Sequence, residues 1–149
     1  MSPAWKPNVT VAAVIEHAGR FLLVEEETPD GIRLNQPAGH LDPGETLLEA
    51  VSRETLEETA CRFTPDALLG VYMVRSGNAG DAERVTYVRF AFTGQLGREE
   101  TGRALDAGIL RTLWLSADEI RVRAAQHRSP LVMKCVDDHL AGQRFPLSV

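Results

Sequence analysis

Apolar residues along the chain follow the periods of strands and helices in an interleaved order. The stretch 9–15 is rich in β-branched residues and 21–24 is apolar after a His-Ala-Gly turn, so both are predicted strands. A Thr-Pro-Asp-Gly turn precedes a short extended piece at 32–35. The stretches 68–74 and 84–93, joined by a Gly-Asn-Ala-Gly loop, are two further predicted strands, because apolar residues alternate along the second.

Capping residues mark where the helices start and stop. A helix is expected over about 46–59, directly after an Asp-Pro-Gly turn. Ser116 and Glu119 have the spacing of a capping box, which predicts a second, short helix. The last helix is expected to begin with Ser129 as its N-cap and to stop at Gly142.

Two remaining stretches complete this order. The stretch 94–108 is polar and glycine-rich and is predicted to be a mobile loop, and 113–115 is predicted to be a short strand. Strands and helices are therefore interleaved without forming a regular βαβ series. This order predicts an α/β fold, a sandwich with helices on both faces of a mixed central sheet.

The composition is that of a globular protein, with 44% hydrophobic and 25% charged residues. The length of 149 residues suits one domain over 1–149. No apolar run is long enough to span a bilayer, and the first seven residues lack the apolar core of a signal peptide. Two cysteines indicate neither a disulfide scaffold nor a zinc site. We therefore expect one cytoplasmic domain that does not bind membranes.

The net charge of −5 argues against nucleic acid as a partner. It leaves a small phosphorylated ligand open, because a metal ion held by carboxylates can supply positive charge. Whether the chain is a monomer or a homodimer does not follow from these properties.

Three carboxylates fall on one side of the first predicted helix. Glu54, Glu57 and Glu58 stand at i, i+3 and i+4, within an arc of roughly 100° on a helix. Like charges this close repel by about 0.2–0.5 kcal/mol per pair on an exposed helix. A divalent cation would turn this repulsion into binding, and oxygen ligands favour Mg²⁺ or Mn²⁺ over zinc. Taken alone, the three glutamates are more simply a solvated acidic face.

The spacing of the surrounding residues favours the metal site. Gly39, Glu45 and Arg53 precede the three carboxylates in the order G-x5-E-x7-R-E-x-x-E-E. This segment resembles the box of the Nudix hydrolase family in every fixed position but the last, where Ala60 replaces the family glycine. Thr55 also occupies a slot that is usually hydrophobic. The resemblance implies an αβα sandwich over almost the whole chain, and metal-dependent hydrolysis of a phosphoanhydride bond.

The resemblance also implies roles for individual residues. Glu57 and Glu58 are the expected metal ligands, and the main-chain carbonyl of Gly39 is a further one. Glu54 is a ligand or the general base, so that Glu54 and Glu57 are both candidates for direct catalysis. Arg53, the third residue placed in the catalytic group, is expected to orient the helix carboxylates rather than touch substrate.

Supporting roles follow for the rest of the box. Arg53 can pair with Glu49 or Glu57 at i±4, and Glu45 is expected to tie the loop to the helix. Ala60 either adopts a left-handed conformation at the helix end, which costs about 1 kcal/mol, or lets the helix continue. We expect modest consequences for stability and none for metal binding.

Many Nudix enzymes take one more acid from a later loop. Glu99, Glu100 and Asp106 are available in this chain, and plain solvation is the favoured interpretation for each.

The substrate prediction rests on segments outside the box. The stretches 35–41, 128–132 and 142–147 resemble Nudix phosphatases that release orthophosphate from nucleoside tri- and diphosphates. The resemblance extends to action on hydroxymethylpyrimidine pyrophosphate and thiamine diphosphate. His40, Arg75 and Arg89 are candidate substrate contacts. The alternative for His40 is a solvated turn residue, and the default for each arginine is placement at the surface.

Two other functions stay open. One is a Nudix pyrophosphohydrolase for nucleotide sugars or dinucleotides, which would give two phosphate-bearing products. The other is a non-catalytic Nudix-like domain that senses a nucleotide, although such domains tend to lose box glutamates and this chain retains them.

Overall fold

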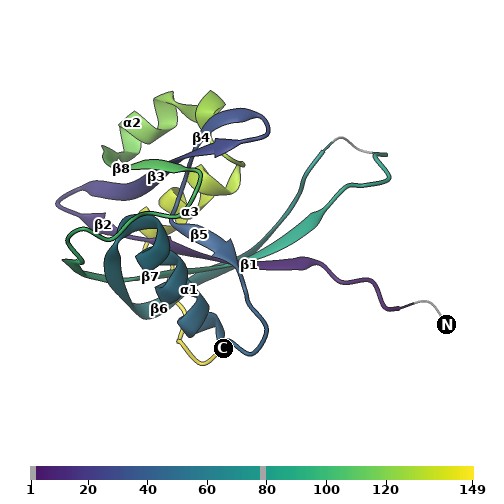
Figure 1. The fold of residues 1–149 in the computed structure, drawn as a ribbon, viewed down its shortest axis with the longest axis horizontal. Helices are drawn as coiled ribbons and strands as arrows, with labels where there is room; N and C mark the ends of the chain where they lie inside the picture. The colour runs from purple at the N-terminus through teal and green to yellow at the C-terminus, as the bar shows by residue number, and fades with distance from the viewer. Residues whose placement is uncertain (1–2, 78–79) are drawn as a thin grey trace.

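Strand β1 (Asn8–Val14) lies inside a mixed sheet with the order β5-β1-β7-β6 (Figure 1). The computed structural model describes residues 3–77 and 80–149. Strand β1 runs parallel to β7 (Thr86–Glu99) and antiparallel to β5 (Ala38–His40). The long strand β6 (Cys61–Arg75) follows antiparallel to β7 and forms the edge. The mixed sheet predicted from the sequence is thus confirmed.

A second sheet is built around β3 (Arg20–Thr28). This strand pairs antiparallel with β2 (Glu16–His17), β4 (Gly31–Asn35) and β8 (Ile109–Ser116). The pairing with β8 shifts register between Glu25 and Glu26. The irregularity falls at the end of β3 that carries its acidic residues.

The helices are α1 (Leu47–Thr59), α2 (Ala117–Val122) and α3 (Leu131–Leu140), with a 3-10 turn at Ala124–Gln126. Alternate residues of β1 enter two different core layers. One layer joins β1 to α1 through Val11, Ala13, Ile15, Ala50 and Val51. The other joins β1 to α2 and α3 through Ala12, Val14, Ile120, Val132 and Val136. Because both faces of β1 are buried, its sequence is a nearly continuous apolar run, and the αβα sandwich is confirmed.

Several boundaries differ from the sequence prediction, among them the starts of β6, at Cys61 instead of 68, and of β8, at Ile109 instead of 113. Strand β7 continues to Glu99, so the first residues of the predicted 94–108 loop are extended. Gly94 lies in this strand where the main chain of Thr64 comes so close that no Cβ would fit. Gly94 allows the close approach of β6, but its residue type is also typical of loops, and it was predicted to lie in one.

The other differences are smaller. The short strand β5 was not predicted, and α3 begins at Leu131, whose N–H donates to Ser129 Oγ at 3.1 Å. The predicted loop residues Asn78 and Ala79 lie outside the described residues. Within the described ranges, no helix combines the length and apolar character needed to cross a membrane.

Candidate metal centre

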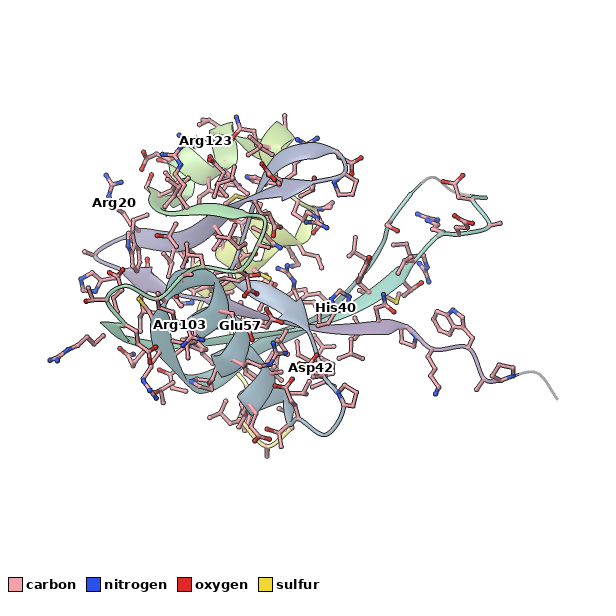
Figure 2. The ribbon with its side chains drawn as sticks, in the orientation of Figure 1. Arg20, His40, Asp42, Glu57, Arg103 and Arg123 are labelled. Atoms are coloured by element: carbon pink, nitrogen blue, oxygen red, sulfur yellow. The ribbon has the colours of Figure 1, made fainter. Side chains whose placement is uncertain are left out.

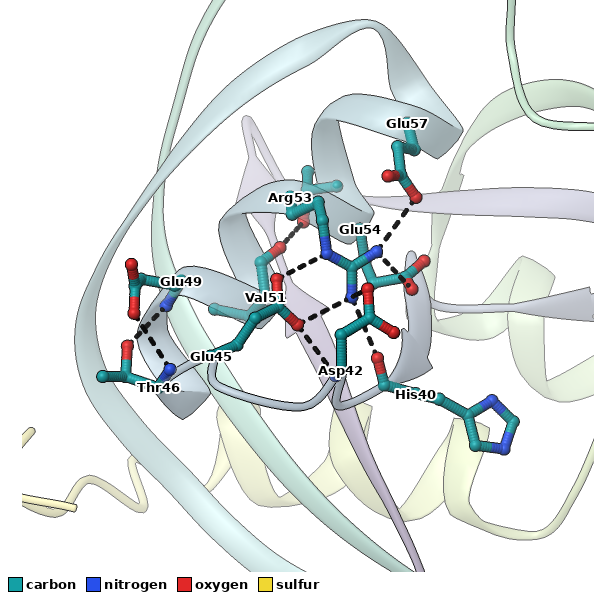
Figure 3. A network of polar contacts seen from close by, with 10 residues as sticks. His40, Asp42, Glu45, Thr46, Glu49, Val51, Arg53, Glu54 and Glu57 are labelled. Atoms are coloured by element: carbon teal, nitrogen blue, oxygen red, sulfur yellow. Dashed lines mark hydrogen bonds and ion pairs between the residues drawn. The ribbon is translucent and has the colours of Figure 1, made fainter.

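The N-terminus of α1 is fixed by a capping box directly after the Asp-Pro-Gly-Glu turn. Thr46 Oγ1 accepts the Glu49 N–H at 3.1 Å, and Glu49 Oε1 accepts the Thr46 N–H at 2.9 Å (Figure 3). These bonds satisfy two helix donors that would otherwise lack partners. Because Glu49 is used here, it is not the partner of Arg53, which was one of the two predicted pairings.

Arg53 is the centre of the polar network on this side of α1 (Figure 3). Its Nε and Nη2 donate to the two oxygens of Glu45 at 2.6 and 2.9 Å. Its Nη1 donates to Glu54 at 2.9 Å and to Glu57 at 3.1 Å, and Nη2 also reaches the His40 carbonyl at 3.0 Å. The pairing with Glu57 and the tie from Glu45 to the helix are as predicted. Arg53 therefore holds two of the box carboxylates in fixed orientations.

Glu54 lies against the main chain of Gly39. A Cβ built on Gly39 would collide with the carboxylate of Glu54, so only glycine leaves room for it here. Gly39 is held in place by pairing with Val11 of β1. The predicted approach of the Gly39 main chain to the carboxylates is therefore present.

The described residues include one group of three acids able to share a metal ion, formed by Glu54, Glu57 and Asp106. One carboxylate oxygen of each lies within 4.8 Å of the others. Asp106 reaches the helix because its N–H donates to the Glu57 carbonyl at 3.0 Å. Asp106 is exposed, as the favoured solvation implies, but the loop also folds back onto the end of α1 and places this carboxylate beside the helix glutamates.

The two other loop acids lie elsewhere. Glu100 forms ion pairs with Arg62 at 3.1 Å and Arg103 at 3.0 Å, and Glu99 is exposed at the end of β7 opposite Cys61. No pattern in the sequence distinguishes Asp106 from them. The distinction comes from the main-chain bond to Glu57, which depends on the folded path of the loop.

Glu58 points toward β5 instead of joining this group. Its side chain accepts the Ala38 N–H at 2.9 Å and the residue is only 7% exposed. Burial raises the pKa of Glu58 to about 8, and the nearby charges of Glu26, Glu54 and Asp106 act in the same direction. Its predicted role as a metal ligand stays a prediction.

Burial also raises the pKa of Glu54 to about 7, against the opposing effect of Arg53. Glu57 and Asp106 add negative charge that raises it further. Near neutral pH these carboxyls bind protons more readily than isolated carboxyls do. A divalent cation bound in place of the protons would relieve the same repulsion between the carboxylates. An all-oxygen donor set around concentrated negative charge fits Mg²⁺ or Mn²⁺.

The three candidate substrate residues lie in different surroundings. His40 is exposed at the end of β5, with its ring 6.2 Å from Tyr87, and Figure 3 shows the ring turned away from Arg53. Figure 2 shows His40 and Glu57 on the same side of the molecule. Arg75 is exposed opposite Thr86.

Arg89, by contrast, is buried. The residue is 6% exposed, and its guanidinium donates to Asn35 Oδ1 and Gln36 Oε1, both at 2.9 Å. Gln36 in turn donates to the Val132 carbonyl at 2.8 Å. The surface placement expected by default for Arg89 is therefore wrong, because its guanidinium joins β7 to the β4–β5 segment and, through Gln36, to α3.

Comparison with known proteins gives consistent results. The NUDIX domain family model matches residues 5–135. The chain is 37% identical to phosphatase NudJ of Escherichia coli K12 over 145 residues, covering 97% of this chain and 91% of NudJ. NudJ of Shigella boydii matches to the same extent.

Solved structures agree with this assignment. A NUDIX hydrolase from Nitrosomonas europaea has a TM-score of 0.88 at 53% identity, covering 95% of this chain and 94% of its own. A MutT NUDIX hydrolase from Burkholderia pseudomallei shares the fold with a TM-score of 0.71 at 23% identity, over 90% of this chain and 98% of its own. The chain belongs to the Nudix hydrolase family.

Proposed function

We propose that this chain is a divalent-metal-dependent phosphatase that hydrolyses phosphoanhydride bonds of nucleoside tri- and diphosphates and releases orthophosphate. The observation that carries the proposal is the group of carboxylate oxygens from Glu54, Glu57 and Asp106, all within 4.8 Å of one another on the box helix and its facing loop. The similarity to phosphatase NudJ supports orthophosphate as the product.

The donor set fits Mg²⁺, with Mn²⁺ as the second choice. Glu54, Glu57 and Asp106 would hold the ion, and Glu58 and the Gly39 carbonyl are further donors. A bound divalent cation neutralises charge on the phosphoryl group under attack and on its leaving group.

The chain's own residues prepare the site in three ways. Arg53 fixes the orientation of Glu54 and Glu57 through Nη1, so it acts on the reaction through these carboxylates. Glu54 is buried with a pKa raised to about 7, which suits either a ligand or a general base that accepts a proton from water. The contact of Glu54 with Gly39 brings this carboxyl close to the main chain of β5.

The proposal extends to hydroxymethylpyrimidine pyrophosphate and thiamine diphosphate as substrates. These have the same phosphoanhydride bond, and the resemblance of segments 35–41 and 128–132 to such phosphatases supports them. The enzyme would act in the cytoplasm on small phosphorylated molecules, as a single domain that is monomeric or a homodimer.

A screen of phosphorylated metabolites with Mg²⁺ tests the proposal. Orthophosphate, pyrophosphate and nucleoside monophosphate are measured for each compound, with EDTA and Glu57→Gln as the inactive controls. Orthophosphate from nucleoside tri- and diphosphates is the expected product. Two phosphate-bearing halves from nucleotide sugars or dinucleotides would indicate a pyrophosphohydrolase, and tight nucleotide binding without turnover would indicate a sensor.

A further inference from the structure

An ion pair joins two distant segments of the chain beside the carboxylates. Arg128 Nη1 donates to Glu26 Oε1 at 3.0 Å, across 102 positions of sequence. The Glu26 side chain is 14% exposed, whereas that of Arg128 is 45% exposed. The acid is therefore fixed in the protein, and the arginine lies at the surface with room to change partner.

The main chain of Arg128 is anchored to the segment that also holds Glu58. The Arg128 N–H donates to the Leu34 carbonyl at 2.8 Å. Four residues later, the Ala38 N–H donates to the Glu58 carboxylate at 2.9 Å. The segment 34–38 thus bonds Arg128 at one end and Glu58 of α1 at the other.

Glu26 is connected to the loop of the candidate metal centre through the residue that follows it. The Glu27 N–H donates to the Gly108 carbonyl at 2.8 Å, and Gly108 belongs to the loop that carries Asp106. The charge of Glu26 also acts on Glu58, where it adds to the effect of burial on the pKa. The pair therefore lies at the rim of the candidate metal centre.

Arg128 differs from Arg53 and Arg89 in how its guanidinium is bonded. Arg53 is committed to Glu45, Glu54 and Glu57, and its side chain is 26% exposed. Arg89 is buried and donates to two amide oxygens through both terminal nitrogens. Arg128 contacts Glu26 through one terminal nitrogen, so its guanidinium can offer further donors to an incoming anion. A guanidinium suits the oxygens of a phosphate group, which it can bind with two parallel hydrogen bonds.

We propose that Arg128 is a substrate-binding residue that takes the phosphate group lying outside the carboxylate cluster, and that Glu26 holds the guanidinium in place until substrate arrives. The inference rests on the proposed function, because it assumes a substrate with at least two linked phosphates. One phosphate faces the acidic group of α1. The next phosphate replaces Glu26 as the acceptor of the N–H groups of Arg128. Arg128 thereby selects for diphosphate or triphosphate over monophosphate ligands.

The test compares Arg128→Gln with Arg121→Gln, a matched control. Arg121 of α2 forms an exposed ion pair with Asp137 of α3 at 2.9 Å, and its side chain is 55% exposed. Binding of a β,γ-imido nucleoside triphosphate is measured by calorimetry in the presence of Ca²⁺, together with KM and kcat for orthophosphate release with Mg²⁺. Arg128→Gln is expected to weaken analogue binding and raise KM about tenfold or more, with kcat changed less than threefold. Arg121→Gln is expected to leave both within twofold.

Two further variants separate binding from a structural role. Arg128→Lys retains the charge but loses the planar fork, so its affinity is expected to lie between those of the wild type and Arg128→Gln. Glu26→Gln releases Arg128, so analogue binding is expected to be unchanged or tighter. If Glu26→Gln weakens binding as much as Arg128→Gln does, the pair is structural and the inference is wrong.

The outcomes also distinguish this inference from the proposed function. Normal turnover with unchanged KM in Arg128→Gln would overturn the inference and leave the phosphatase proposal standing. Arg128-dependent analogue binding in a wild-type protein that releases no orthophosphate would support the site and overturn the phosphatase proposal. The analogue affinity lost in Arg128→Gln should also shrink as salt is raised, since the contact is exposed.

Discussion

Arg53 and Arg89 each place a guanidinium partly or fully inside the protein, but the partners of Arg53 are charged and the side-chain oxygens bonded to Arg89 are neutral. Arg53 is surrounded by carboxylates no more than 11 positions away in sequence, and those of Glu45, Glu54 and Glu57 raise its pKa. Arg89 is 6% exposed and donates to the neutral oxygens of Asn35 and Gln36, more than 50 positions away. Charge is therefore concentrated on α1 and the turn before it, while the layer between β7 and α3 uses neutral acceptors to join distant segments.

The largest effect is expected on activity, from a substitution among the carboxylates around Arg53. Glu57→Gln removes one carboxylate of the candidate metal centre but retains an acceptor for Arg53. We expect orthophosphate release to fall at least about a hundredfold, because each 1.4 kcal/mol of lost stabilisation costs a factor of ten. Glu49→Gln, which alters a carboxylate on the same helix outside the cluster, should remain active. Full activity in Glu57→Gln would sink the assigned role.

Substitution of Arg89, which donates to neutral oxygens between β7 and α3, should lower the free energy of unfolding. Arg89→Met leaves the oxygens of Asn35 and Gln36 buried without their donor, at about 1–3 kcal/mol for each unsatisfied group. We expect the free energy of unfolding in urea to fall by about 2–4 kcal/mol. Arg121→Met, at an exposed ion pair, should change it by less than about 1 kcal/mol. A similar small change in Arg89→Met would mean that this arginine does not hold the layer together.

The free energy of unfolding should depend on pH through the buried glutamates of α1. The folded protein raises the pKa of Glu54 to about 7 and of Glu58 to about 8, so it binds more protons than the unfolded chain above about pH 4.5. This stabilisation is complete at lower pH and is lost as the pH rises through 7 and 8.

Urea unfolding of the metal-free protein measures this loss. Between pH 5.5 and pH 9 we expect the free energy of unfolding to fall by roughly 2 kcal/mol, with a smaller fall in Glu58→Gln. Equal slopes in the two proteins would show that Glu58 is not the titrating group.

The smallest effect is expected at the end of α1. Ala60 has φ of 61°, the left-handed alternative of the sequence analysis. Ala60→Gly relieves about 1 kcal/mol of strain but removes a buried methyl worth about 0.8 kcal/mol, so stability should change by less than about 1 kcal/mol. Ala50→Gly, at a buried position in the first turn of α1, should destabilise by about 1 kcal/mol or more. Turnover should be unchanged, and a tenfold rise in Ala60→Gly would contradict the purely structural role.

The same contrast explains what the sequence could predict. The pairing of Arg53 with Glu57 was predictable because the two residues are four positions apart on a helix. The role of Glu45 and the choice of a metal site over a solvated face followed from the family resemblance. The strands of the two core layers were found from their apolar pattern. The contact of Asp106 with α1 depends on how far β7 extends, and glycines within that strand resembled a loop.

Asp106 provides the most direct test of the central claim, that a loop acid completes a metal centre begun on the box helix. Mn²⁺ binding to the wild type and to Asp106→Asn can be measured from the electron paramagnetic resonance signal of the free ion. We predict Mn²⁺ binding by the wild type and at least about tenfold weaker binding by Asp106→Asn, with loss comparable to that in Glu57→Gln. Equal Mn²⁺ affinity in wild type and Asp106→Asn would contradict the account.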